Sequence, residues 1–202
     1  KHTLVLADLS GVHDACPGYE EISCQFSGRP VAQQEYISKW TVETQVQPGS
    51  YALNDFDFKN TRKDLKARAR VQREHSHADY EIYDYPGQYV ESSDAEKCAR
   101  TRIEELHAWY EVATAGCDAR GISVGHTFAL TGHPRDDQNR QYLVTSAHFN
   151  IDAGGFESGG ENGGAVVFSC DFTAIDASQQ FRTPRTTPRP SIPGPQTAMV
   201  VG

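Results

Sequence analysis

One stretch with a clear helical period constrains the fold of this chain most strongly. Behind Ser93, apolar residues recur at steps of three and four and form a single stripe along a helix. The stripe consists of Ala95, Ala99, Ile103, Leu106, Tyr110 and Ala113. Ser93 and Glu96 have the spacing of a capping box, and Gly116 is a suitable C-terminal stop. The sequence therefore predicts an amphipathic helix over residues 93–115, which should lie against a sheet or close the end of a barrel.

Most of the remaining chain has the composition of strands and turns. Alternating apolar and polar residues predict strands in YISKWTVETQV, SYALNDFDF and YEIYDY, with turns at Pro48-Gly49 and Pro86-Gly87. After the helix, ISVGHTFALTG and QYLVTSAHFNI flank the turn-rich HPRDDQN and predict a hairpin. AVVFSCDFTAI predicts the last strand, whereas the charged residues 59–79 predict a loop or an exposed extended piece. The expected fold class is α+β, mainly β.

The C-terminal part of the chain is rich in proline. Because proline lacks an amide donor and fixes φ, the segment from Pro184 to Pro195 cannot enter a central strand or a helix. We expect an extended linker there, and we expect the final TAMVVG to begin a strand of another domain.

Three arginines lie in this linker or directly before it, at positions 182, 185 and 189. Two interpretations remain open for Arg182, Arg185 and Arg189. They either keep the linker soluble or brace it against an acidic neighbour, because an arginine fork can hold a carboxylate with two hydrogen bonds.

Composition and charge disfavour several classes of protein. The nine Tyr, nine Phe and two Trp argue against a disordered chain. A net charge of −8 disfavours sequence-independent binding to nucleic acid and to an anionic membrane surface. No stretch approaches the ~18–20 apolar residues that span a bilayer. Because the only Met is Met199, Lys1 is not a translational start, and we expect a processed chain or a piece of a longer protein.

Cysteines and histidines do not predict a metal site. The five cysteines lack CxxC spacing and indicate free thiols rather than a disulfide framework. His75 and His77 fall on the same side of an extended segment, but a zinc site needs three or four ligands at close spacing. We therefore predict no metal-binding residue.

Motifs for metal-dependent catalysis and for cofactor binding are equally absent from the sequence. It contains no HExxH and no phosphate-binding glycine loop. Paired carboxylates such as Asp55/Asp57 and Glu104/Glu105 are typical of solvated faces and turns. We predict no catalytic residue, no cofactor-binding residue and no cofactor, so we do not expect this chain to be an enzyme.

From about Trp40 onward the chain resembles the valine-glycine repeat protein G (Vgr) family, the spike of the bacterial type VI secretion system. It is also similar to the baseplate hub of contractile-tailed phages. The stretches that carry the resemblance are ALNDFDFKNTRKDL, YEIYDYPGQY, CARTRIEELHA, GCDARGISVGHTFALTGHPRDDQNRQYLVTSAHF and TPRPSIPGPQTAMVVG. The family often has Gly-Asn at Cys117-Asp118 and Glu at Gln141, so this chain departs from the family at a turn and at a strand edge.

The resemblance implies an arrangement of domains. Residues 1–85 would be a strand-rich part of the hub-like region, and residues 86–183 a barrel-like, phage-tail-hub-like domain with the helix 93–115. Residues 184–202 would be the proline-rich linker and the first strand of a following oligosaccharide-binding-type (OB-type) domain.

The resemblance also implies a function without catalysis. Three chains would form a homotrimer whose barrel-like domains make a ring of approximate sixfold symmetry. This ring would dock on the hexameric tube of haemolysin-coregulated protein (Hcp), and a needle beyond it would puncture the target envelope and deliver effector proteins. The spike would assemble in the bacterial cytoplasm and then be translocated, with no nucleic-acid partner and no stable membrane insertion.

Two other functions remain as alternatives. One is a lysozyme-like cell-wall hydrolase of a baseplate. The other is a carbohydrate- or protein-binding module, which an exposed aromatic platform built from Tyr83, Tyr85 and Tyr89 would support.

Overall fold

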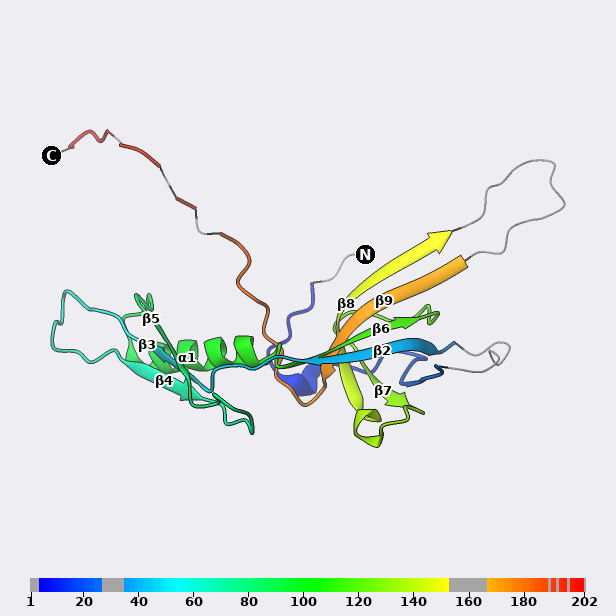
Figure 1. The fold of residues 1–202 in the computed structure, drawn as a ribbon. Coiled ribbons are helices and arrows are strands. Elements are labelled where there is room, and N and C mark those ends of the chain that lie inside the picture. Colours follow the sequence, from blue (N-terminus) through cyan, green and yellow to red (C-terminus); the bar gives the residue numbers. More distant parts are fainter. Residues whose placement is uncertain are drawn as a thin grey trace.

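The computed structural model describes residues 4–26, 35–152, 167–188, 190, 191, 193–195 and 197–201. Within these residues the chain forms nine strands, one α-helix and two short 3-10 helices, Ser10–Val12 and Asp136–Gln138. The strands make one six-stranded and one three-stranded sheet (Figure 1). The predicted α+β, mainly β fold class is confirmed.

The six-stranded sheet forms a barrel-like body. Its strand order is β1-β7-β8-β9-β6-β2, and all neighbours are antiparallel except β1 and β7. The strands are β1 (Glu21–Ser23), β2 (Ile37–Thr44), β6 (Glu111–Cys117), β7 (Thr127–Thr131), β8 (Gln141–Asp152) and β9 (Val167–Asp176). The sheet curls until its two edge strands, β1 and β2, meet. Cys24, directly after β1, forms a β-bridge with Ile37 of β2, and the Gln25 amide donates to the Ile37 carbonyl at 2.9 Å. Closure of this kind protects strand edges from non-native pairing.

Alternate residues of these strands fill the interior of the body. The buried core residues are Ile22, Cys24, Ile37, Ala113, Ala115, Cys117, Ala119, Ile122, Phe128, Leu130, Tyr142, Val144, Cys170, Phe172 and Ala174. The Trp40 ring lies edge-on to the rings of Tyr142 and Phe128, with centroid distances of 4.8 and 6.4 Å. Aromatic pairs of this geometry add to the stabilisation from burial alone. The hairpin predicted around HPRDDQN is confirmed, since β7 and β8 pair with each other.

The second sheet and the helix form an α/β lobe, residues 50–107, between β2 and β6 in the chain. The sheet has the order β4-β3-β5. Its elements are β3 (Ser50–Leu53), β4 (Ala67–Arg70), β5 (Glu81–Asp84) and α1 (Ser92–His107). Helix α1 packs on β3 and β4 and shares with them a core of Tyr51, Leu53, Leu65, Ala67, Tyr89, Ala95, Ala99 and Ile103. Figure 1 shows the lobe beside the barrel.

The predicted helix is correct in its first half and wrong at its C-terminal end. Helix α1 ends at His107, and residues 111–115, which the sequence placed in the helix, belong to β6. Ala113 continued the helical spacing by coincidence, because it also belongs to the alternating pattern of β6 that faces the barrel core. The capping box is wrong as well. The N-cap residue is Glu91, which makes no side-chain capping hydrogen bond, and Ser93 is already inside the helix.

The helix does not close the barrel. The core that α1 shares with β3 and β4 contains residues from both sides of the domain boundary expected between residues 85 and 86. The division into residues 1–85, 86–183 and 184–202 stays a prediction. No helix in the described ranges is long and apolar enough to cross a membrane.

Beyond β9 the chain runs as an extended segment that first crosses the body and then leaves it (Figure 1). This agrees with the extended linker that the prolines predict. Residues 197–201 form no strand with the described part of the chain, and their role as the start of another domain stays a prediction.

Candidate functional site

Asp55 and Asp57, one of the carboxylate pairs in the sequence, accept hydrogen bonds from backbone amides. The Asp55 carboxylate accepts a hydrogen bond from the Phe56 amide at 2.7 Å and another from the Gln88 amide. These backbone hydrogen bonds lower the pKa of Asp55. Asp57 accepts from the Lys59 amide at 2.8 Å. Such contacts fix a turn around these two carboxylates.

The histidine pair His75 and His77 does not form a ligand set. The His75 ring stacks on Tyr110, with centroids 5.6 Å apart, whereas the His77 ring lies 4.7 Å from the Tyr80 ring. Among the residues that the structure describes, no three His, Cys, Asp or Glu side chains gather as metal ligands would.

The cysteines whose pairing was in question are free thiols, as predicted. Burial raises the pKa of Cys24 to about 11 and that of Cys117 to about 12. Cys117 and Cys170 are register partners on β6 and β9, inside the barrel core. High pKa values and burial make these thiols poor nucleophiles.

The three tyrosines of the expected aromatic platform do not share a surface. Tyr83 and Tyr85 are exposed, but Tyr89 is buried in the core of the lobe, where its hydroxyl donates to the Leu65 carbonyl at 2.9 Å. The interpretation as one exposed platform is therefore wrong. Tyr89 packs closely against the chain at Gly87, where a Cβ atom would lie 2.2 Å from its ring.

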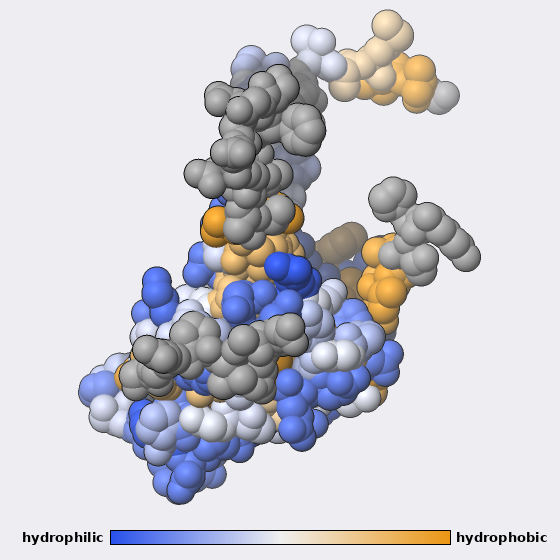
Figure 2. Space-filling view, turned by 90° about the vertical axis from the view of Figure 1, so that its right-hand side faces the viewer, coloured by the Kyte–Doolittle hydropathy of each residue, from blue (hydrophilic) through white to orange (hydrophobic). Residues whose placement is uncertain are grey.

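The outer ends of β8 and β9, residues 146–152 and 167–173, form a ribbon with two different faces. Strand β6 still pairs with β9 as far as Cys117 and Cys170, and from residues 150–152 and 167–169 outward the ribbon is two-stranded. The strand register places Phe149 opposite Cys170 and Ile151 opposite Phe168, so these side chains share one apolar face. Near the body this face belongs to the barrel core, but further out Phe149 is 43% and Ile151 68% exposed. Figure 2 shows hydrophobic residues gathered where the ribbon projects from the body. An exposed apolar face of this kind is typical of a surface that another protein covers.

The segment after β9, residues 179–185, forms a strap across the body. Arg182 Nε donates to Glu104 Oε2 at 2.8 Å, and its guanidinium also pairs with Asp8. The Arg185 amide donates to Glu105 Oε1 at 2.9 Å. The interpretation that arginines brace this connector against acidic neighbours is confirmed for Arg182 and Arg185, whereas Arg189 lies outside the described residues.

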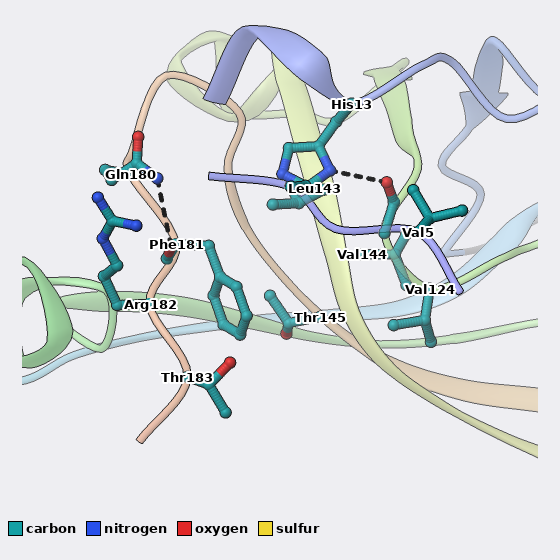
Figure 3. Close-up of a pocket in the computed structure, with 12 residues that line it drawn as sticks. Val5, His13, Val124, Leu143, Val144, Thr145, Gln180, Phe181, Arg182 and Thr183 are labelled. Carbon is teal, nitrogen blue, oxygen red and sulfur yellow. Dashed lines mark hydrogen bonds between the residues drawn. The ribbon is translucent and has the colours of Figure 1, made fainter. Parts of the chain in front are cut away.

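A small cavity of about 340 Å³ lies where the strap meets β8 and the N-terminal segment (Figure 3). Its apolar wall includes Val5, Val124, Leu143 and Phe181. His13 Nδ1 donates to the Gly125 carbonyl at 2.9 Å at its edge. Polar side chains such as Thr145, Gln180 and Thr183 line the rest of the cavity, so its wall is mixed in character.

Sequence reasoning missed a polar cluster at the junction of barrel and lobe. His107 is buried, and its Nε2 donates to the Pro48 carbonyl at 3.0 Å. Arg73 lies over the Tyr110 ring, 4.3 Å from its centroid, and Arg140 pairs with Glu111. No local sequence motif predicts these contacts, because the partners lie far apart in the chain.

Comparisons with known proteins agree with the architecture. Residues 1–155 match the family model described as phage tail baseplate hub (GPD). The chain is 43% identical over 202 residues to type VI secretion system spike protein VgrG1b of Pseudomonas aeruginosa and 44% identical over 203 residues to VgrG1c of the same organism. These alignments cover 100% of this chain but 27% and 28% of the two relatives, so the chain spans about a quarter of their length.

Two solved structures share the fold at low sequence identity. The 43 kDa tail protein of prophage MuSo2 from Shewanella oneidensis has a TM-score of 0.55 at 8% identity, covering 83% of this chain and 47% of that one. A tail protein from Neisseria meningitidis has a TM-score of 0.50 at 10% identity, covering 80% and 46%. The resemblance to the Vgr spike family is thus confirmed, and the chain belongs to the phage tail baseplate hub family.

Proposed function

We propose that this chain is the hub part of a type VI secretion spike that works as a homotrimer. The observation that carries the proposal is identity of 43–44% along the whole chain to proteins named as spikes of that system. In this function three copies form a ring, the ring docks on the hexameric Hcp tube, and the spike carries effector proteins into target cells. The spike assembles in the cytoplasm and is then translocated.

The contacts described above support a role in assembly. The ribbon presents an apolar face that a neighbouring copy would cover, and burial of apolar surface is the main favourable contribution to association. The carboxylates described above are engaged in turns and ion pairs, and the buried thiols have raised pKa values. These features favour a structural part without turnover over a hydrolase.

The test is the mass of the full-length parent protein in solution, measured by light scattering at micromolar concentration. We expect the mass of three chains. The variant Ile151→Ser should weaken the trimer, whereas Asn150→Ser, on the opposite face of the same strand, should not. A monomeric parent protein would contradict the proposal.

A second experiment tests the partner and the route. Tagged parent protein should retain Hcp on an affinity column and should appear in the medium only when the secretion system is intact. Hydrolysis of purified peptidoglycan by this chain would instead favour the lysozyme-like alternative.

A further inference from the structure

The strap, residues 179–185, joins three parts of the molecule that are distant in sequence. Besides its arginine contacts, Gln180 Nε2 donates to the Asp8 carbonyl at 3.0 Å, and the Ser10 amide donates to Gln180 Oε1 at 3.2 Å. Gln179 Oε1 accepts from Arg73 at 2.6 Å. The strap therefore touches the N-terminal segment and the α/β lobe directly after leaving the barrel.

We propose that the strap is an ionic latch, which fastens the outgoing chain to the end of α1 and can open while the barrel and the lobe stay folded. The proposal does not depend on the proposed function. In a spike, such a latch would fix the direction in which the chain leaves the hub.

The placement of Glu104 and Glu105 is the first argument. Both lie near the end of α1, which stops at His107. The C-terminal end of a helix carries partial negative charge and disfavours carboxylates. Two adjacent glutamates are therefore in an unfavourable position for the helix alone, and cations from outside the helix explain them.

The geometry of the latch is the second argument. Arg182 Nε lies 2.8 Å from Glu104 Oε2, and Arg185 Nε lies 3.5 Å from Glu105 Oε2. Arg102 on α1 also pairs with Glu105, at 2.9 Å. The extended strap thus delivers one arginine to each of two neighbouring carboxylates.

The balance of apolar and charged contacts is the third argument. Phe181 is the apolar anchor of the strap: Figure 3 shows its ring pointing into the cavity and the Arg182 side chain turned away from it. The contacts of Gln179, Gln180, Arg182 and Arg185 described above are polar, and the side chains of Arg182 and Arg185 are 22% and 51% exposed. The core residues of β9 end at Ile175, before the strap. Opening the strap therefore breaks ion pairs without removing a residue from either main core.

Limited trypsin digestion of the chain tests the latch. The bonds Arg182–Thr183 and Arg185–Thr186 are trypsin sites, and substitutions in α1 leave them unchanged. We expect Glu104→Gln/Glu105→Gln to be cut at these bonds roughly five- to tenfold faster than the wild type, the factor expected from losing two partly exposed ion pairs. Mass spectrometry identifies the sites. Circular dichroism should show an unchanged fold.

The matched control is Asp94→Asn/Glu96→Gln, which removes two carboxylates from the other end of α1. It should be cut in the strap at the wild-type rate. Cleavage of Glu104→Gln/Glu105→Gln at the wild-type rate would overturn the proposal. So would cleavage that rises in parallel at sites inside the lobe, such as Lys63 and Arg68, because the strap would then open only when the lobe unfolds.

A salt series on the wild type needs no substitution. Raising the ionic strength from about 0.1 M to about 1 M shortens the screening length severalfold and should speed cleavage in the strap. Rates are corrected with a peptide substrate, because salt also affects trypsin. An unchanged corrected rate would refute an ionic latch even if the variants fail to fold.

Discussion

Arg73 Nε donates a hydrogen bond to His107 Nδ1, 3.4 Å away, while His107 Nε2 donates to the Pro48 carbonyl. Both ring nitrogens are thus used by a neutral imidazole, and a second proton on Nδ1 would face the Arg73 guanidinium. Burial lowers the pKa of His107 below 6.5. The hydrogen bond to the Pro48 carbonyl opposes this effect and raises the pKa, whereas the charges of Arg73 and His75 lower it further.

We expect this arrangement to make the fold less stable in mild acid. Because the folded-state pKa is depressed, the unfolded chain takes up a proton below pH 6.5 that the folded chain does not bind. The free energy of unfolding should fall as the pH drops, by up to about 1.4 kcal/mol per pH unit for this one group. Urea unfolding between pH 7.5 and 5 measures the slope. His107→Gln should reduce it, whereas His148→Gln, on the exposed ribbon, should not.

Gln138 should be important for the stability of the barrel. Its side-chain oxygen accepts hydrogen bonds from Trp40 Nε1 at 3.2 Å and from the Tyr142 hydroxyl at 3.0 Å. Gln138→Ala leaves both donors unpaired, and we expect a loss of about 2–4 kcal/mol in the free energy of unfolding. Denaturant titration tests this. Gln141→Ala, an exposed change nearby, should stay within about 0.5 kcal/mol, and an equal result for the two would contradict the prediction.

Gly49 should not tolerate a side chain. A Cβ atom there would lie 1.8 Å from the Ala78 carbonyl oxygen, and this backbone atom cannot turn away as a side chain could. We expect Gly49→Ala to destabilise the fold by about 1–3 kcal/mol, the usual cost of overpacking. Gly11→Ala is the control, because nothing lies within 4 Å of its added atom. Thermal unfolding of the two variants side by side gives the comparison.

The thiols should differ in reactivity. Cys98 is half-buried on α1, whereas the other four cysteines are buried. A pKa of about 12 for Cys117 and of about 11 for Cys24 keeps these two thiols protonated even at pH 9. A chromogenic thiol reagent should therefore label Cys98 first and the rest only in denaturant, and Cys98→Ser should abolish the fast phase. Rapid labelling of several thiols in the native chain would show that the barrel core opens readily.

The sequence predicted local elements better than their partners. Alternation was sufficient for β7 and β8, but it could not show that β3 belongs to a different sheet from β2. The segment ARAR looked like a charged loop, yet Ala67 is buried against α1 while the arginines face outward, and the small size of alanine hid this pattern. The end of α1 was missed because Ala113 fits a helical and a strand period equally well.

The contacts of the candidate site could not be predicted from the local sequence either. The arginines of the linker suggested an acidic neighbour, but Arg182 and Glu104 are 78 residues apart, and no local signal chooses Glu104 over other carboxylates. His107 gave no signal at all, because its environment is created by residues from three separate segments. Only packing of the folded chain brings such groups together.

The α/β lobe begins and ends at one place on the barrel. Strands β2 and β6 are antiparallel neighbours up to the pair Thr44 and Glu111, and the Gln45 amide still donates to the Tyr110 carbonyl at 2.8 Å. In topological terms the whole lobe is an elaborated hairpin loop. Evolution can therefore enlarge, trim or exchange this flank without changing the spacing of the barrel strands, so relatives can diversify their lateral surfaces on a constant barrel.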